Sequence, residues 1–153
     1  MKPPFGPTVA SALSVVHEAP KYVAVNVSIS RSFRLEAARF LPRLPASHPC
    51  SRLHGHSFVV EVELEGPIDP QLGWLVDYDD ITRAWAPIAE ALDHRLLNEV
   101  DGLDNPTSEL LAHWIFVRLA PSFPSLTAII VMETPETRAT YRPARPNPSE
   151  AHP

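Results

Sequence analysis

The sequence predicts one α+β domain in which two helices pack on one face of a four-stranded antiparallel sheet. Two N-terminal segments alternate between apolar and polar residues, two segments with helical apolar stripes follow, and a β-forming apolar run comes after them. A period of two is typical of half-buried strands, and a spacing of three or four is typical of amphipathic helices. Helices grouped between two strand pairs, in the order ββααββ, favour this architecture.

The first two strands are predicted over 23–35 and from Phe58 to Leu64, where Glu61 and Glu63, with Glu65 after them, face away from the apolar side chains. His54 and His56 share the parity of the apolar set in the second strand. If this strand begins early enough, both imidazoles point to its buried side. Two shorter strands are predicted after the helices, over 126–133 and 138–142.

The first helix is predicted over 79–91, with Asp77 as its cap and a bend at Pro87. The second helix is predicted to begin at Asn105 as cap and Pro106 as first helical residue, and to end at Ala120. The expected apolar stripes are Tyr78, Ile81, Trp85, Ile88 and Leu92 in the first helix, and Leu110, Leu111, Trp114, Ile115 and Leu119 in the second.

The composition of the chain limits the classes of function that it can have. A chain of 153 residues with 44% hydrophobic and 20% charged residues fits one soluble domain. A net charge of -5 argues against a nucleic-acid binder, and no apolar run approaches the length of a membrane span. The single cysteine excludes an internal disulfide and favours a reducing compartment, so we expect a cytoplasmic protein.

The 18 prolines crowd toward both ends of the chain. We therefore expect a disordered N-terminal extension over 1–20, a folded domain over 21–142 and a disordered proline-rich tail over 143–153. Charge is uneven as well, because five arginines and one acid lie between Arg31 and His56. This excess indicates an anionic ligand such as a phosphate, or else a set of solvated surface arginines.

Cys50 stands four residues before the His54-Gly55-His56 pair. Residues two apart on a strand face the same way, so both imidazoles can approach one metal ion, and a nearby thiol is a ligand, a nucleophile or a proton carrier. The alternative is a surface-turn cysteine beside two structural histidines. Two histidines are too few for a closed zinc site.

Three further positions carry polar groups suited to chemistry. Asp93 precedes His94 at the end of the first helix, as an acid–base pair or a helix-end cap. Thr107 and Ser108 open the second helix, where they bind a polar ligand or only cap the helix. Glu133 ends the apolar run, where it accepts hydrogen bonds from an amino-pyrimidinone edge or simply meets solvent.

Six short motifs follow one another along residues 32–142. They are Phe33-Arg34-Leu35-Glu36-Ala37-Ala38, Cys50-x-x-x-His54-Gly55-His56, Gly73-Trp74-Leu75-Val76-Asp77, Leu92-Asp93-His94, Asn105-Pro106-Thr107-Ser108-Glu109 and Met132-Glu133-Thr134. In this order they resemble the 6-pyruvoyl-tetrahydropterin synthase / 6-carboxytetrahydropterin synthase family. The cysteine spacing is more similar to the bacterial 6-carboxytetrahydropterin branch than to the animal pyruvoyl branch.

The resemblance implies the T-fold, in which subunits join their sheets into an oligomeric barrel, usually a homo-hexamer with active sites between subunits. It implies a lyase that acts on 7,8-dihydroneopterin triphosphate. Triphosphate and a two-carbon fragment would leave, giving 6-carboxytetrahydropterin on the path to queuosine and other deazapurines.

By position, the resemblance implies that Cys50, Asp93 and His94 form the proton-transfer set. The pterin ring would be held by Glu133 and contacted by Thr107 and Ser108. His54 and His56 would be zinc ligands, and the zinc would polarise the oxygens of the substrate side chain.

The chain departs from the family pattern at Arg39, which stands where the family has its first zinc histidine. Catalytic zinc normally takes three protein ligands, and a guanidinium has no lone pair to donate. Three outcomes are open. His48 or a neighbouring subunit supplies the third ligand, or zinc binds weakly with little activity, or the Arg39 guanidinium occupies the zinc position as a fixed cation.

Three functional hypotheses follow. The first is a 6-carboxytetrahydropterin synthase with an altered metal site. The second is a metal-free enzyme that performs a simpler proton transfer or side-chain cleavage on a related pterin. The third is a non-catalytic paralog that binds a pterin or assembles with a true family member.

Overall fold

A computed structural model describes residues 25–144 of the chain. The extension predicted over 1–20 lies outside the described residues, as does all but the first two positions of the tail predicted over 143–153. Within the described part, no helix is long and apolar enough to cross a bilayer.

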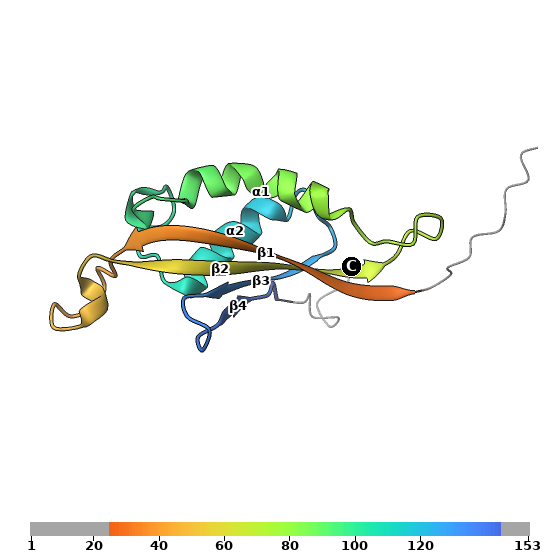
Figure 1. The fold of residues 1–153 in the computed structure, drawn as a ribbon. Helices are drawn as coiled ribbons and strands as arrows, with labels where there is room; N and C mark the ends of the chain where they lie inside the picture. The colour runs from red at the N-terminus through yellow and green to blue at the C-terminus, as the bar shows by residue number, and fades with distance from the viewer. Residues whose placement is uncertain (1–24, 145–153) are drawn as a thin grey trace, which may run out of the picture.

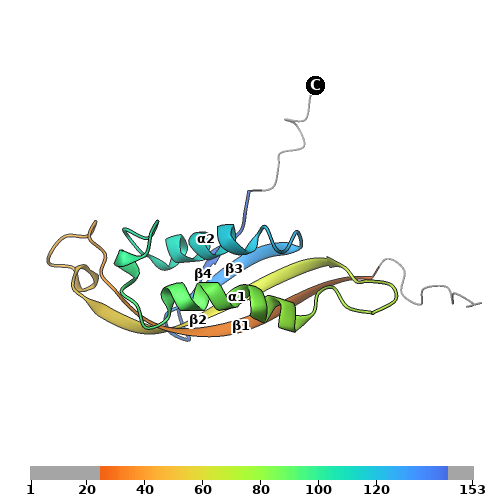
Figure 2. The same ribbon diagram turned by 90° about the horizontal axis from the view of Figure 1, so that it is seen from above.

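Four antiparallel strands form one sheet in the order β1-β2-β3-β4. They are β1 (Asn26–Arg39), β2 (His54–Pro67), β3 (Leu126–Met132) and β4 (Ala139–Tyr141). The helices α1 (Tyr78–Leu92) and α2 (Ser108–Leu119) connect β2 to β3 and lie side by side on one face of the sheet (Figures 1 and 2). The predicted α+β class and the placement of both helices are confirmed.

Strand register decides which side chains face the helices. Phe58, Val60, Val62 and Leu64 of β2 are all fully buried, whereas the residues between them are not. Because β2 begins at His54, both histidines share this side of the strand, as the parity predicted. The long β1–β2 pairing ends with Arg39 opposite His54.

Helix α1 begins one residue before its predicted start. Asp77 is its cap, since its Oδ1 accepts a hydrogen bond from the Asp79 N–H at 2.9 Å. Four of the five stripe residues are buried, but Tyr78 is exposed, so that part of the prediction is wrong. Tyr78 occupies the first position of the helix, which lies beyond the edge of the core.

The predicted start of α2 is wrong by two residues. Thr107 is the cap, with its hydroxyl accepting from the Leu110 N–H, and the helix begins at Ser108. The Thr107 N–H donates to the Asn105 carbonyl, so the chain up to Pro106 is still turning. The buried side of α2 contains Ser108, Leu111, Ala112 and Ile115, whereas Leu110 is exposed, so its predicted place in the apolar stripe is wrong.

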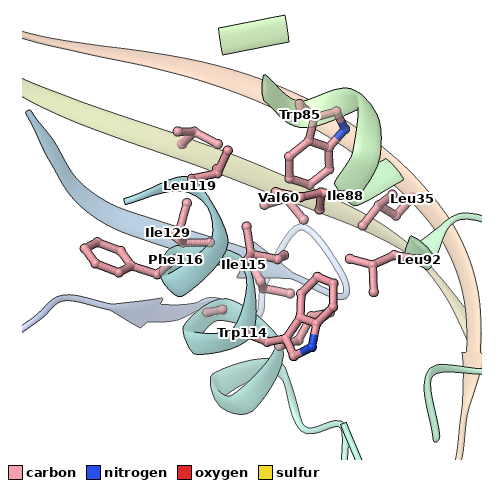
Figure 3. Packing of buried hydrophobic residues seen from close by; sticks show 14 of the residues in the cluster. Leu35, Val60, Trp85, Ile88, Leu92, Trp114, Ile115, Phe116, Leu119 and Ile129 are labelled. Atoms are coloured by element: carbon pink, nitrogen blue, oxygen red, sulfur yellow. The ribbon is translucent and has the colours of Figure 1, made fainter. Parts of the chain in front are cut away.

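One hydrophobic core fills the space between the sheet and the helices (Figure 3). Trp85 and Ile88 of α1 pack over β1 and β2, and Trp85 stacks on Phe33 with ring centroids 4.4 Å apart. Ile115 and Leu119 of α2 pack over Ile129 of β3. This core fixes the end of the sheet at which β1 stops, β2 starts and β3 stops.

The segment after α1 runs along the outer edge of β1. The His94 N–H donates to the Glu36 carbonyl at 2.6 Å, the Ala38 N–H donates to the Arg95 carbonyl at 2.9 Å, and Leu96 forms a parallel bridge with Ala38. These contacts hold Asp93 and His94 beside the last residues of β1.

Candidate functional site

The candidate site lies where three strands and one helix meet. Arg39 is the last residue of β1, His54 and His56 open β2, Glu133 follows the last residue of β3, and Ser108 is the first residue of α2. Antiparallel pairing brings the end of β1 beside the start of β2, and the β2–β3 register places the end of β3 beside the same segment.

The Arg39 side chain is only 3% exposed and makes three hydrogen bonds. One terminal nitrogen donates to the Pro106 carbonyl at 2.9 Å and to Ser108 Oγ at 3.3 Å. The other donates to Glu133 Oε1 at 2.5 Å. The guanidinium also lies 5.3 Å from the ring centre of Phe58, which is cation–π range. Arg39 Nε is buried without a partner in the described part.

The two imidazoles present buried nitrogens to the same region. His54 Nδ1 lies 2.8 Å from the Arg52 carbonyl, which can only accept, so Nδ1 carries a proton and neutral His54 has its lone pair on Nε2. Burial lowers the pKa of His56, and the nearby Arg39 charge lowers it further. The Nε2 atoms of both histidines are buried without a hydrogen-bond partner among the described residues.

These two histidines suit a metal ion, but the rest of the zinc site does not fit. Within residues 25–144, no group of three His, Cys, Asp or Glu side chains is placed to hold an ion. His48, the predicted substitute ligand, instead accepts a hydrogen bond from the Cys50 N–H through its Nδ1. Arg39 adds a permanent positive charge beside His56. The described residues of one chain therefore do not form a three-ligand zinc site.

Glu133 is ionised and already engaged. Burial raises the pKa of its carboxyl, but hydrogen bonds from Ser108 and Arg39, with the Arg39 charge, more than offset this and leave the pKa below its usual range. Oε1 accepts from both Ser108 Oγ and Arg39. Oε2 lies 3.7 Å from His56 Nε2 and accepts no hydrogen bond from the described residues.

Asp93 and His94 form a second cluster on the β1 edge. Asp93 Oδ1 accepts from the Glu36 N–H at 2.8 Å, and Oδ2 lies 2.9 Å from His94 Nδ1. The backbone hydrogen bond from Glu36 and then that from His94 hold the pKa of Asp93 below its usual value. The carboxylate thus orients the imidazole of His94.

His94 has a φ of 56°, and it is the one non-glycine residue of the described part with positive φ. Such a conformation costs of order 1–3 kcal/mol and clusters at functional sites. Here Asp93 and the Glu36 carbonyl hold it in place. Histidine is enriched among non-glycine residues with positive φ, but its presence alone does not predict this conformation, which depends on the tertiary contacts of His94.

A cleft of about 540 Å³ lies at the end of the β1–β2 ladder, beside the segment that follows α1. His56 and His94 both line it, together with Glu36, Gly55 and Ser57. A second cleft, of about 220 Å³, opens beside Ser108 and Glu133.

The structure brings most of the predicted site residues together. His54, His56, Ser108 and Glu133 share one cluster with Arg39, while Thr107 caps α2 immediately beside it. Cys50 is half-buried in the short 3₁₀ turn Pro49–Ser51 of the β1–β2 loop. In the described part, no hydrogen bond or ion pair joins Cys50 to Asp93 or His94.

Two features of the site were not predicted. The Pro106 carbonyl accepts from Arg39, and backbone acceptors of this kind leave no trace in a sequence. The arginine-rich segment also divides: Arg39 points into the protein, whereas Arg31, Arg34, Arg43 and Arg52 are exposed. A sequence pattern records the excess of charge but not which member is buried.

The fold and site define an antiparallel α+β domain with a buried polar cluster at one end of its sheet. The 6-pyruvoyl tetrahydropterin synthase family matches residues 28–144. A 6-carboxy-5,6,7,8-tetrahydropterin synthase of a Synechocystis species is 35% identical over 126 residues, covering 78% of this chain and 96% of that protein. This chain belongs to the 6-pyruvoyl tetrahydropterin synthase family.

Two other relatives bear on the comparison. A dihydroneopterin monophosphate aldolase of Pyrococcus furiosus is 39% identical over 72 residues, which cover 47% of this chain and 60% of that protein. The structure of 6-pyruvoyl tetrahydropterin synthase from Caenorhabditis elegans superposes with a TM-score of 0.73 at 26% identity, covering 78% of this chain and 97% of the other. The described fold is thus that of a solved pterin synthase.

Proposed function

We propose that this chain is a pterin lyase of the 6-carboxytetrahydropterin synthase type, cytoplasmic and serving queuosine or deazapurine biosynthesis. Its substrate would be 7,8-dihydroneopterin triphosphate, from which triphosphate and a two-carbon fragment leave. The observation that carries the proposal is the cleft lined by both His56 and His94, with His94 already paired to Asp93. The Synechocystis relative supports the product by its name.

The proton-transfer roles follow from the geometry of the second cluster. His94 is exposed to the cleft and held by Asp93 and Glu36, so its imidazole can exchange protons with a bound substrate. His56 is also among the residues that line this cleft, and burial and the Arg39 charge lower the pKa of its imidazole, which favours the neutral form. The cleft thus offers the Asp93–His94 pair as its acid–base group.

The ring would be bound near Glu133, whose carboxylate is complementary to the adjacent N–H donors of a 2-amino-pyrimidinone. Ser108 and Thr107 stand beside it as further polar contacts. We propose no step through zinc, because the described residues do not form a three-ligand site. Arg39 instead supplies a permanent positive charge to the site.

To take part in proton transfer, Cys50 would need the Asp93–His94 pair of a second subunit. It sits on the β1–β2 loop, which projects beyond the helical layer (Figures 1 and 2), and has no bond to the Asp93–His94 pair of its own chain. We propose that the chain assembles as a homo-oligomer, a hexamer by family resemblance. Cys50 of one subunit would then complete the proton-transfer set of another.

A second candidate is side-chain cleavage of a dihydroneopterin phosphate, the reaction class named for the Pyrococcus relative. The absence of a third metal ligand in the described part favours it, since breaking the bond between the first two side-chain carbons needs an acid–base pair. That reaction leaves a hydroxymethyl group on the ring, whereas the synthase reaction leaves a carboxylate.

The test is product analysis with 7,8-dihydroneopterin triphosphate and with the monophosphate, using purified chain without an affinity tag. Mass spectrometry distinguishes the carboxylated product from the hydroxymethyl product. His94→Ala should abolish turnover, while His113→Ala, an exposed histidine on α2, should leave it unchanged. Pterin binding without consumption of either substrate would instead identify a non-catalytic paralog and contradict the proposal.

A further inference from the structure

Arg39 makes with Glu133 and Ser108 the contacts that a pterin ring would need. The 2-amino-pyrimidinone edge of a pterin contains a guanidine unit, with adjacent N–H donors on N3 and on the 2-amino group. The guanidinium of Arg39 presents the same planar pattern of adjacent N–H donors. It already donates to Glu133 Oε1 at 2.5 Å and to Ser108 Oγ at 3.3 Å.

The hydrogen bond from Arg39 occupies Glu133 Oε1, an oxygen that a bound ring would also need. Glu133 Oε1 accepts from Arg39 and also from Ser108, so both its lone-pair directions are taken. Only Oε2 is free of a hydrogen bond, at 3.7 Å from His56 Nε2. A ring edge with two parallel donors needs both oxygens, so it cannot bind in the bidentate manner while Arg39 stays in place.

Several contacts hold the Arg39 side chain in its position. Its side chain is 3% exposed, its second arm is anchored on the Pro106 carbonyl at 2.9 Å, and Phe58 lies against its guanidinium. Arg39 Nε remains buried and unpartnered in the described part, next to a cluster that also contains the unpartnered Nε2 atoms of His54 and His56. A polar ligand is therefore still needed to complete this cluster.

We propose that Arg39 is an intramolecular occupant of the ring-binding site, which competes with a pterin for Glu133 and Ser108. This inference rests on the proposed function, because it takes Glu133 as the anchor of the ring. When a ring enters through the cleft beside Ser108 and Glu133, the guanidinium moves off Oε1 toward the two histidines. Affinity for the ring is lowered by the fraction of time that Arg39 holds the anchor.

The test measures binding of neopterin, a fluorescent 2-amino-4-oxopteridine, to the full chain and its variants by equilibrium titration. Arg39→Met removes the competing donors and is expected to tighten binding by about tenfold or more. Arg39→Lys keeps a buried positive charge beside Glu133 but lacks the planar fork, so it should fold even if Arg39→Met does not, and should also bind more tightly. Arg34→Met, an exposed arginine of the same strand, should leave affinity unchanged.

Glu133→Gln, introduced into the Arg39→Met chain, should reverse the gain, since the competing and the ring-binding donors share one carboxylate. The inference is overturned if Arg39→Met and Arg39→Lys bind neopterin no more tightly than the wild type, or more weakly, because Arg39 would then support the anchor rather than occupy it. A wild type that turns over a pterin substrate in that case leaves the proposed function intact. If no folded variant binds neopterin or turns over a pterin, the proposed function itself fails.

Discussion

Arg39 and His54 face one another across the last pair of the β1–β2 ladder, so the residue that departs from the family pattern lies directly opposite a retained histidine. The two side chains share one buried region but no hydrogen bond joins them in the described part. Arg39 reaches past the histidines to Glu133 on the far side of β2. Arg39 therefore bears on two proposed features of the site, the set of metal ligands that the family resemblance implies and the hydrogen bonding of the Glu133 carboxylate.

Phe58 should be a main support of the site. It is fully buried, with Arg39 at 5.3 Å and the His56 ring at 5.3 Å. Phe58→Ala is expected to lower the free energy of unfolding by about 3–5 kcal/mol, because it leaves a cavity beneath the cluster. Phe58→Leu keeps most of the volume and should cost less than about 1.5 kcal/mol. If urea denaturation shows that both variants lose the same free energy of unfolding, the volume of the Phe58 side chain does not support the site.

Arg39 and Glu133 should be energetically coupled. Removing either partner leaves a mostly buried charge without its counterpart, so Arg39→Met and Glu133→Gln are each expected to destabilise the fold. The double variant should cost less than the sum of the two by about 1–3 kcal/mol. Strictly additive costs in chemical denaturation would mean that the ion pair contributes nothing, while Glu136→Gln, an exposed glutamate, should be nearly neutral.

The intersubunit origin of Cys50 can be tested by complementation. Cys50→Ser and His94→Ala are each expected to be inactive, yet co-expressed subunits should form some sites with both wild-type groups. With equal mixing and one group from each neighbour, the chance is ½ × ½, so about a quarter of wild-type activity should return. If the mixture stays inactive although hybrid oligomers form, Cys50 does not act on the neighbouring pair.

Asp93 should make stability depend on pH. Its pKa is lowered in the folded state from an ordinary value of 3.8, first by the Glu36 N–H and then by His94. A lowered pKa stabilises the fold above the unfolded value, and this contribution is lost as the pH falls through the folded value. Asp93→Asn should therefore be less stable than the wild type near neutral pH, and the difference should shrink as the pH falls below 3.8.

Thermal denaturation across this pH range measures the difference. Asp104→Asn removes an exposed carboxylate that makes no side-chain hydrogen bond in the described part, and its cost should be small throughout. A gap between Asp93→Asn and the wild type that is the same at every pH would contradict the assigned role of the Glu36 and His94 contacts.

Much of the fold could be predicted because it is encoded in short-range patterns. The period of two in β2 correctly placed His54 and His56 on the side of Phe58. The errors in element bounds arose at helix ends, where more than one residue can act as the N-cap. Asn105 and Thr107 are both suitable caps, and the turn that ends at Pro106 makes Thr107 the cap. The wrong assignment of Leu110 to the buried stripe accompanied that shift.

The site was predicted as a set of residues but not as a set of contacts. The resemblance indicated that Arg39 stands in place of a ligand, yet its partners lie 67 to 94 positions further along the chain, just before α2, at its first residue and after β3. Such pairings depend on strand register and helix packing, which a single sequence does not specify. The positive φ of His94 likewise follows from tertiary hydrogen bonds rather than from residue type.

We propose that Arg39 stands in place of a metal ligand and supplies a permanent cation, and the zinc content of the purified chain tests this proposal. Wild-type chain and Arg39→His, purified without tag or chelator and dialysed against micromolar zinc, are compared by elemental analysis. Arg39→His should retain about one ion per subunit, because an imidazole at position 39, opposite His54, would join His54 and His56 as a third ligand. The wild type should retain well below one ion per subunit. About one tightly held ion per subunit in the wild type would contradict the claim.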